Sequence, residues 1–235
     1  MLQPAASAER REAADAILDA AEAVFAEHGF AAATTRAIAD LAKVNLALIH
    51  YYFRTKEQLF EAVFVRRSDE INDRRRVILA ELFSGAAAPA LEQILVALLR
   101  PTIEVGRMSN GGGFHYARMV VNVASGHDER STRLTGMQYN GIAREFIDAI
   151  QKVLPGISRE MAVWSYMHAI NIAMPLMARN VRPAVLSDGL CRDDDLDAVI
   201  DNAVTFIAAG IRALAVSHAV DEAGRPRPGN NGTPA

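Results

Sequence analysis

The stretch "TTRAIADLAKVNLALIHYYF", residues Thr34 to Phe53, holds two short helical patterns in succession. Thr34 or Thr35 is a suitable N-cap for the first helix, and Asn45 for a second helix over Leu46–Phe53. The second helix carries more large apolar and aromatic side chains than one buried face can hold. The sequence therefore predicts that much of it is exposed, in particular Leu46, Ala47, Leu48, His50, Tyr51 and Tyr52.

Two short helices joined by a tight turn, with the second one exposed, form the helix-turn-helix pattern. In that pattern the second helix enters the major groove of DNA while the first crosses the phosphate backbone. Apolar side chains can then contact thymine methyl groups, and polar tips can contact base edges or phosphates. The stretch therefore predicts a DNA-binding function.

The rest of the chain is also predicted to be helical. Of its 235 residues 51% are hydrophobic, alanine is abundant, and no run of alternating β-branched residues is bounded by turn dipeptides. We therefore expect an all-α protein. Apolar periodicity and capping residues predict a first helix at about 9–27, a second that starts at Thr34 or Thr35 and ends within "LAKVN" (41–45), and a third at 46–53. A fourth starts at Thr55 and can continue to Leu82, and further helices are predicted at about 89–106, 113–125, 129–153, 158–180 and 194–216.

Composition also suggests how the chain is divided. We expect disordered ends at residues 1–8 and 221–235, a three-helix DNA-binding domain at 9–54, and a larger helical domain at 55–220. The single cysteine, Cys191, cannot form an internal disulfide, and the first residues contain no apolar signal-peptide core. These features predict a cytoplasmic protein.

The uncharged run at residues 161–178 is expected to be a buried helix. It approaches the roughly 20 apolar residues that a membrane span requires. However, Ser165, His168, Asn171 and Pro175 interrupt it. We therefore expect no membrane partner.

The run "ILDAAEAVFAEHGFAAATTRAIADLAKVNLALIHYYFRTKEQLFEAVF", within residues 10–65, resembles the DNA-binding domain of the tetracycline-repressor (TetR) family. The resemblance covers roughly a quarter of the chain. It implies a transcriptional regulator whose C-terminal helices dimerise and bind a small molecule. By matching position it implies contacts of double-stranded DNA with Thr34, Thr35, Arg36, Lys43, Asn45, Leu46, Ala47, Leu48, His50, Tyr51, Tyr52 and Lys56.

Two positions depart from the family pattern. Lys43 occupies a turn position where the family often has glycine, and a left-handed conformation there would cost about 1 kcal/mol. His50 replaces a more usual tyrosine. Because the residues at 46–48 have almost no polar side-chain atoms, thymine-methyl contacts and DNA shape should matter more than hydrogen-bond readout. Nine basic residues against six acids over 36–76 indicate a limited phosphate footprint.

The resemblance implies an effector pocket among the middle helices. Candidate lining residues are Phe114, His115, Arg118, Asn122, Trp164, Met167, His168 and Asn171. Trp164, His168 and Asn171 share one helix face, although all of these residues could equally be ordinary core. The apolar and methionine content favours a largely hydrophobic effector, lipid-like or aromatic, and an acidic effector would point to Arg118.

No catalytic, cofactor or metal pattern accompanies these residues. The "GGG" at 111–113 is not followed by the Lys-Ser/Thr of a phosphate loop, and no HxxxH or CxxC pair occurs. We therefore expect no enzymatic activity. The resemblance to the TetR family implies a homodimer, paired through its last two helices, that binds a palindromic operator. A repressor is the first interpretation, and an activator fits the same residues. The rival is a helical small-molecule-binding protein or enzyme whose N-terminal helices are only structural.

Overall fold

The computed structural model describes residues 4–107, 112–125 and 128–224. This part of the chain is built from α-helices and contains no strand, which confirms the predicted all-α class. The helices are α1 (Pro4–Ala32), α2 (Thr35–Ala42), α3 (Leu46–Phe53), α4 (Lys56–Ser84), α5 (Leu91–Arg107), α6 (Gly112–Ser125), α7 (Glu129–Val153), α8 (Arg159–Leu176), α9 (Arg182–Leu186) and α10 (Leu196–Gly224).

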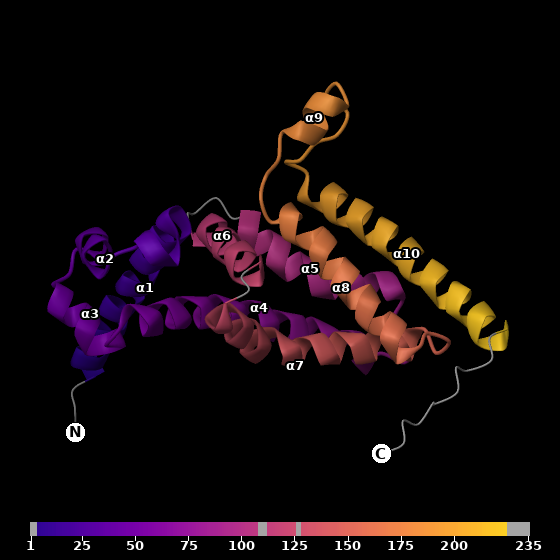
Figure 1. Ribbon diagram of the computed structural model, residues 1–235, viewed down its shortest axis with the longest axis horizontal. Helices are drawn as coiled ribbons and strands as arrows, with labels where there is room; N and C mark the ends of the chain where they lie inside the picture. Colours follow the sequence, from indigo (N-terminus) through magenta and orange to yellow (C-terminus); the bar gives the residue numbers. More distant parts are fainter. Residues whose placement is uncertain (1–3, 108–111, 126–127, 225–235) are drawn as a thin grey trace, which may run out of the picture.

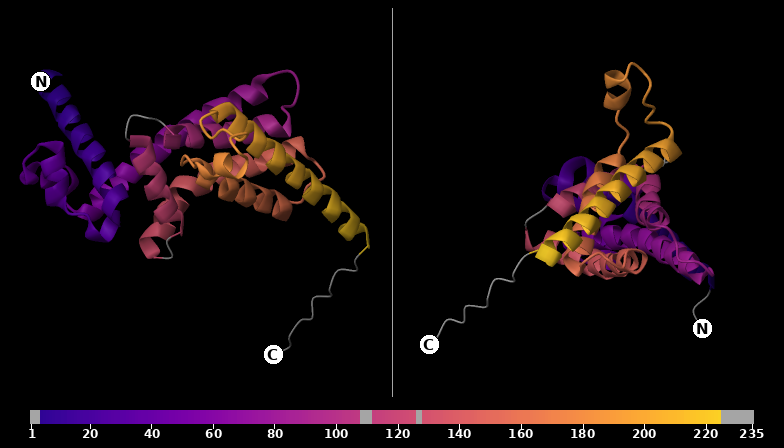
Figure 2. Two further views of the ribbon diagram at one scale, coloured as in Figure 1. Left: turned by 90° about the horizontal axis from the view of Figure 1, so that it is seen from above. Right: turned by 90° about the vertical axis from the view of Figure 1, so that its right-hand side faces the viewer.

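The helices form an elongated molecule with α1–α3 at one end (Figure 1). The long helix α4 starts beside α3 and runs on into the C-terminal bundle, where it packs against α5 and α7. Helix α10 packs on α5 and α8 at the other end, and α9 projects from the bundle on an arm between α8 and α10 (Figures 1 and 2). One continuous helix therefore links the two ends of the protein.

Side-chain caps start the helices where the sequence predicts them. The Oγ1 atom of Thr34 accepts the backbone N–H of Ala37 at 3.1 Å, so Thr34 rather than Thr35 caps α2. Asn45 caps α3 through the N–H of Ala47 at 2.9 Å, and Ser158 caps α8 in the same way. These bonds satisfy donors that a helix start leaves unpaired.

Two apolar cores hold the molecule together. The C-terminal core joins α4, α5, α7, α8 and α10. The N-terminal core joins α1–α4 and also takes in Tyr116, Met119 and Val120 of α6. Helix α6 therefore packs directly on the helix-turn-helix domain.

Several helix limits differ from the predicted ones. Helix α1 begins at Pro4 rather than near residue 9, and α8 ends at Leu176, because Pro175 in its last turn cannot continue a regular helix. Helix α9 was not predicted, since it is a single turn in a segment rich in turn residues. Helix α10 extends through Gly224, and the remainder of the tail lies outside the described residues.

Length and composition alone would allow Leu196–Val216 of α10 to cross a membrane. One third of this apolar stretch is buried inside the protein, where α10 packs against α5 and α8. The same apolar character is typical of a core helix in a soluble bundle.

The close approach of α5 to the end of α8 depends on Gly106. A Cβ atom at this position would lie 2.6 Å from the carbonyl oxygen of Met177 and 2.7 Å from its Cβ atom. We therefore expect Gly106→Ala to reduce the free energy of unfolding by about 1–3 kcal/mol, although alanine favours helices by about 1 kcal/mol. Urea denaturation measures the change, and Gly141→Ala, at an α7 position with open space, is the control that should not destabilise the protein.

Candidate nucleic-acid interface and ligand cavity

Helix α3 presents one face to solvent. Leu46, Ala47, His50 and Tyr51 are exposed, and their spacing places them side by side on the helix. Ile49 is buried in the N-terminal core and anchors the opposite face. Tyr51 is the most prominent group, with 68% of its surface exposed. This outward face confirms the exposed helix that the sequence predicts.

Two of the predicted DNA contacts lie partly against the protein instead. Leu48 and Tyr52 are only partly exposed and pack on the N-terminal core. The ring of Tyr52 meets that of Tyr51 edge to face, with centroids 5.2 Å apart. Tyr52 therefore supports Tyr51, and the outward face is narrower than the sequence alone suggests.

The orientation of His50 is set by the backbone. Its Nδ1 atom lies 3.2 Å from the carbonyl oxygen of Arg54, which can only accept a hydrogen bond. The Nδ1 atom must therefore carry the proton. In the neutral ring, Nε2 is then a free acceptor that can meet an amino group on a base edge.

Lys43 ends α2 in the left-handed conformation, with φ 55° and ψ 40°, as its place in the turn predicts. Its backbone N–H caps the C-terminus of α2 by donating to the carbonyl oxygens of Ala39 and Asp40. Lys43 is exposed to solvent. A residue other than glycine is thus tolerated here at an energetic cost.

Replacing Lys43 by glycine should raise the free energy of unfolding by up to about 1 kcal/mol, because glycine adopts this conformation without the Cβ clash. The added chain entropy of glycine offsets part of the gain. If the ammonium group contacts phosphate, the same change should weaken DNA binding. Denaturation and DNA titration of one variant separate the two effects, and a loss of stability would contradict this explanation.

Few cations remain free around the helix-turn-helix. Arg36, Lys43 and Arg54 are exposed on α2 or in the turns beside α3. Lys56 is not free, because its ammonium group donates to the carbonyl oxygens of Phe30, Ala31 and Ala33 at 2.9, 3.3 and 3.0 Å. These hydrogen bonds tie the start of α4 to the end of α1, and the phosphate contact of Lys56 stays a prediction.

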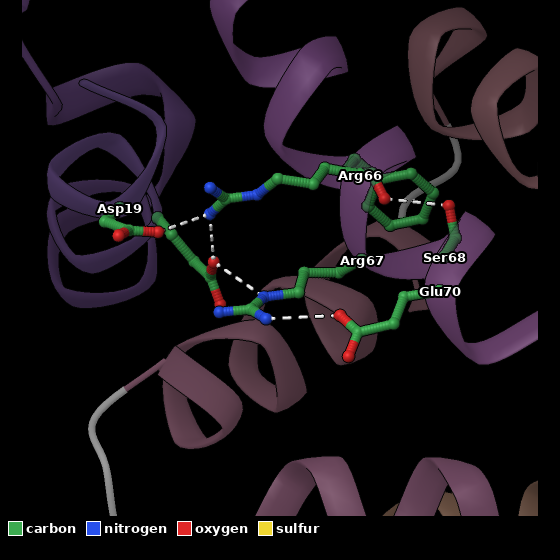
Figure 3. A network of polar contacts seen from close by, with 7 residues as sticks. Asp19, Arg66, Arg67, Ser68 and Glu70 are labelled. Atoms are coloured by element: carbon green, nitrogen blue, oxygen red, sulfur yellow. Dashed lines mark hydrogen bonds and ion pairs between the residues drawn. The ribbon is translucent and has the colours of Figure 1, made fainter. Parts of the chain in front are cut away.

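The arginines of α4 are also engaged within the protein. Arg66 and Arg67 both donate to Glu22 of α1, at 3.0 and 3.1 Å, and Arg66 reaches Asp19 at 2.8 Å (Figure 3). Arg74 and Arg76 pair with Glu104 and Glu145, respectively. These four arginines therefore tie neighbouring helices together, and the limited phosphate footprint stays a prediction.

The C-terminal domain contains a cavity of about 540 Å³ between α4, α5, α6, α7 and α8. Its walls are mainly apolar, as in small-molecule sites. The principal apolar residues are Ile71, Val120, Ile147, Ile170, Met167 and Met174. The size and lining suit a ligand of drug-like dimensions.

One end of this cavity is polar. Arg75 of α4 is buried and donates to the carbonyl oxygen of Leu98 at 2.9 Å, to Asn72 at 3.1 Å and to Thr102 at 2.7 Å. Burial lowers the pKa of its guanidinium group. A charged side chain thus faces a largely apolar cavity.

Tyrosine hydroxyls lie beside this guanidinium. Those of Tyr116 and Tyr139 are 2.8 Å apart, and Tyr166 also lines the cavity. Burial raises the pKa of Tyr116 well above its ordinary value, and it also raises that of Tyr166. These hydroxyls therefore keep their protons at neutral pH and can donate hydrogen bonds.

The cavity includes only part of the predicted pocket. Met167 and Asn171 line it, whereas Trp164 and His168 are exposed and stack on each other outside it, with centroids 5.9 Å apart. His115 is described but is not among the lining residues. The side chains of Phe114, Arg118 and Asn122 lie outside the described residues.

Comparisons with known proteins identify the family. Residues 17–63 match the family described as bacterial regulatory proteins, tetR family, and residues 96–210 match the tetracyclin repressor-like C-terminal domain. Two curated relatives are the HTH-type transcriptional repressor Rv3405c of Mycobacterium tuberculosis and the regulator Mb3439c of Mycobacterium bovis. Each is 52% identical over 54 residues, which is 23% of this chain but only 29% of the relative's length.

Solved structures show the same fold over most of the chain. A putative transcriptional regulator from Pseudomonas aeruginosa is 16% identical, with a TM-score of 0.59 over 86% of this chain and 93% of that one. FadR from Bacillus subtilis, solved with stearoyl-CoA, is 16% identical, with a TM-score of 0.57 over 83% and 98%. With both domain models matched, the chain belongs to the TetR family of bacterial transcriptional regulators.

Proposed function

We propose that this protein is a dimeric, cytoplasmic repressor that binds a palindromic operator and releases it when a small molecule occupies the C-terminal cavity. The observation that carries the proposal is the outward face of α3, where His50 and Tyr51 project from a firmly anchored helix. The exposed cations Arg36, Lys43 and Arg54 surround this face and supply attraction for phosphates.

Some residues that line the cavity also pack in the core of the DNA-binding domain. Tyr116 and Val120 of α6 line the cavity and also belong to the N-terminal core. Ile71 of α4 does the same. A ligand that shifts α6 or α4 therefore acts on residues that position α1 and α3. Such a ligand changes DNA affinity only if it binds the two conformations with different affinities.

A second copy of the chain fits the outer face of α8 and α10. On α10, Ile200, Ile207 and Ile211 are buried within the protomer and are not available to a partner. The exposed side instead presents Phe206, 71% exposed, beside the small residues Ala209 and Gly210. Trp164, which is 51% exposed, extends this apolar face on α8. Two-fold pairing there would set the spacing of the two α3 helices.

The lining of the cavity bears on the kind of effector that this protein binds. The stearoyl-CoA held by Bacillus subtilis FadR is an amphiphile, and the apolar walls of the present cavity favour ligands with a hydrophobic body. The rival function, a small-molecule-binding protein or enzyme with merely structural N-terminal helices, also uses this cavity. An activator would use the same α3 contacts and differ only in operator position.

Selection of bound fragments from the source genome, at a stated moderate salt concentration, tests the proposal. The purified full-length protein should enrich a few fragments that share a palindrome. Failure to enrich any fragment above random genomic DNA would favour the rival function. Light scattering on the same preparation should give the mass of a dimer.

A further inference from the structure

The cavity has an unbalanced charge. Arg75, Arg144 and Arg159 line it, and none of its described lining residues is an aspartate or glutamate. Arg159 is compensated by Asp148 on the outside of the bundle. The side chain of Arg144 is exposed to solvent, whereas that of Arg75 is buried. The interior of the cavity therefore carries a positive charge without an anion.

The hydrogen bonds of Arg75 leave part of its binding capacity unused. Its three acceptors are a carbonyl, an amide and a hydroxyl, and no carboxylate among the described residues forms an ion pair with it. An arginine has five N–H donors, so two remain, one on each terminal nitrogen. A buried cation with only neutral partners is costly, which makes an incoming anion strongly favourable.

The neighbouring tyrosines complete an anion-binding end. In the Tyr116–Tyr139 pair one hydroxyl donates to the other, so one O–H stays available as a donor. Tyr166 lines the same cavity, and the Arg75 charge acts on all three phenols. Fixed donors around a guanidinium match the oxygens of a carboxylate.

We propose that the effector is a hydrophobic carboxylic acid whose carboxylate binds Arg75 and the adjacent tyrosine hydroxyls, with its apolar body along the α7–α8 wall. Ile147, Ile170 and Met174 supply that wall. If the ligand bound in the reverse orientation, its terminal methyl group would lie against the guanidinium of Arg75. The free N–H donors of Arg75 would then stay unsatisfied. A free acid therefore fits better than an ester or thioester that enters with its hydrocarbon end first.

This inference rests on the proposed function for the site but can be tested without DNA. Calorimetric titration of the full-length protein at neutral pH compares hexanoate, decanoate and 4-phenylbutyrate with their uncharged amides, and decanoate with decanoyl-CoA. At least one acid should bind about tenfold or more tightly than its own amide, since hydrogen bonds to charged groups are the stronger kind. Decanoyl-CoA should bind more weakly than decanoate.

Variants assign the preference to Arg75. Arg75→Gln should remove the difference between acid and amide, and Arg75→Lys should retain part of it. The control Arg76→Gln, at an exposed position paired with Glu145, should leave the preference unchanged. Arg75 also donates hydrogen bonds to α5, so the folding of each variant is checked by circular dichroism. The comparison of acid with amide in the unmodified protein decides the question independently of these variants.

The outcomes separate the ligand class from the function. Equal binding of acids and amides, no binding of any acid, or tighter binding of decanoyl-CoA than of decanoate would overturn the carboxylic-acid proposal. Each of these results would still be consistent with an operator-binding repressor whose effector is neutral or linked to CoA. Conversely, specific acid binding without any operator would uphold the ligand class and refute the repressor function.

Discussion

Replacing His50 and Tyr51 together by alanine should weaken operator binding by about a hundredfold. Both side chains point outward from α3, and each base or backbone contact is worth about 1–3 kcal/mol, with 1.4 kcal/mol corresponding to a tenfold change. Binding to unrelated duplex DNA should change much less, because exposed cations supply most of that affinity. Fluorescence anisotropy titrations on operator and shuffled duplexes, at one salt concentration, measure both effects.

The fold should survive this double change, since neither side chain belongs to a buried core. Unfolding curves of the variant and the unmodified protein should therefore nearly coincide. Val77→Ala, at an exposed apolar position on α4, is the matched control and should leave operator affinity unchanged. An unaltered operator affinity in the double variant would show that α3 is not the recognition helix.

Glu22→Ala should lower the free energy of unfolding by about 2–3 kcal/mol. Its side chain is 1% exposed and neutralises both Arg66 and Arg67, which connect α4 to α1 (Figure 3). Removing one partner from a fully buried pair costs about 3–5 kcal/mol. The two arginines are each 25% exposed, so solvent should recover part of that loss. Urea denaturation measures the difference.

Asp19→Ala provides the matched control, because Asp19 binds the same Arg66 side chain from the surface. Asp19 is 67% exposed, and exposed ion pairs contribute about 0–1 kcal/mol. Equal destabilisation by the two substitutions would contradict the view that burial makes Glu22 important. The comparison also tests how firmly the DNA-binding domain is attached to the long helix.

Local signals made the helix-turn-helix predictable. Thr34, Asn45 and Thr55 cap three successive helices through their own side chains. Such features depend on neighbouring residues only. For the same reason α7 begins and ends at the predicted residues, 129 and 153.

Contacts between distant segments could not be predicted in this way. The ammonium group of Lys56 donates to carbonyl oxygens at the end of α1, more than twenty residues earlier in the chain, and no local pattern indicates this partner. Trp164 and His168 share one helix face, as their spacing predicts, and their stacking is a finding of the structure. The face of α8 that turns toward the cavity is set by its packing against other helices. The periodicity of the sequence does not specify that packing.

Arg75 is the important residue that sequence reasoning missed. In the run Arg74–Arg76 it was counted as part of a phosphate footprint. The helix spacing Ser68, Ile71, Asn72, Arg75 and Leu79 would have revealed it, because these residues share the buried face of α4. A charged residue in a buried stripe is a reason to expect a functional site.

The central claim is that cavity occupancy and operator binding are coupled. Its most direct test is an anisotropy titration of the selected operator with this protein, with and without a saturating cavity ligand. We expect the ligand to lower operator affinity by about fivefold to 150-fold, and the operator to lower ligand affinity by the same factor, as linkage requires. A ligand that binds the cavity equally well in free and operator-bound protein, with no change in operator affinity, would contradict the account.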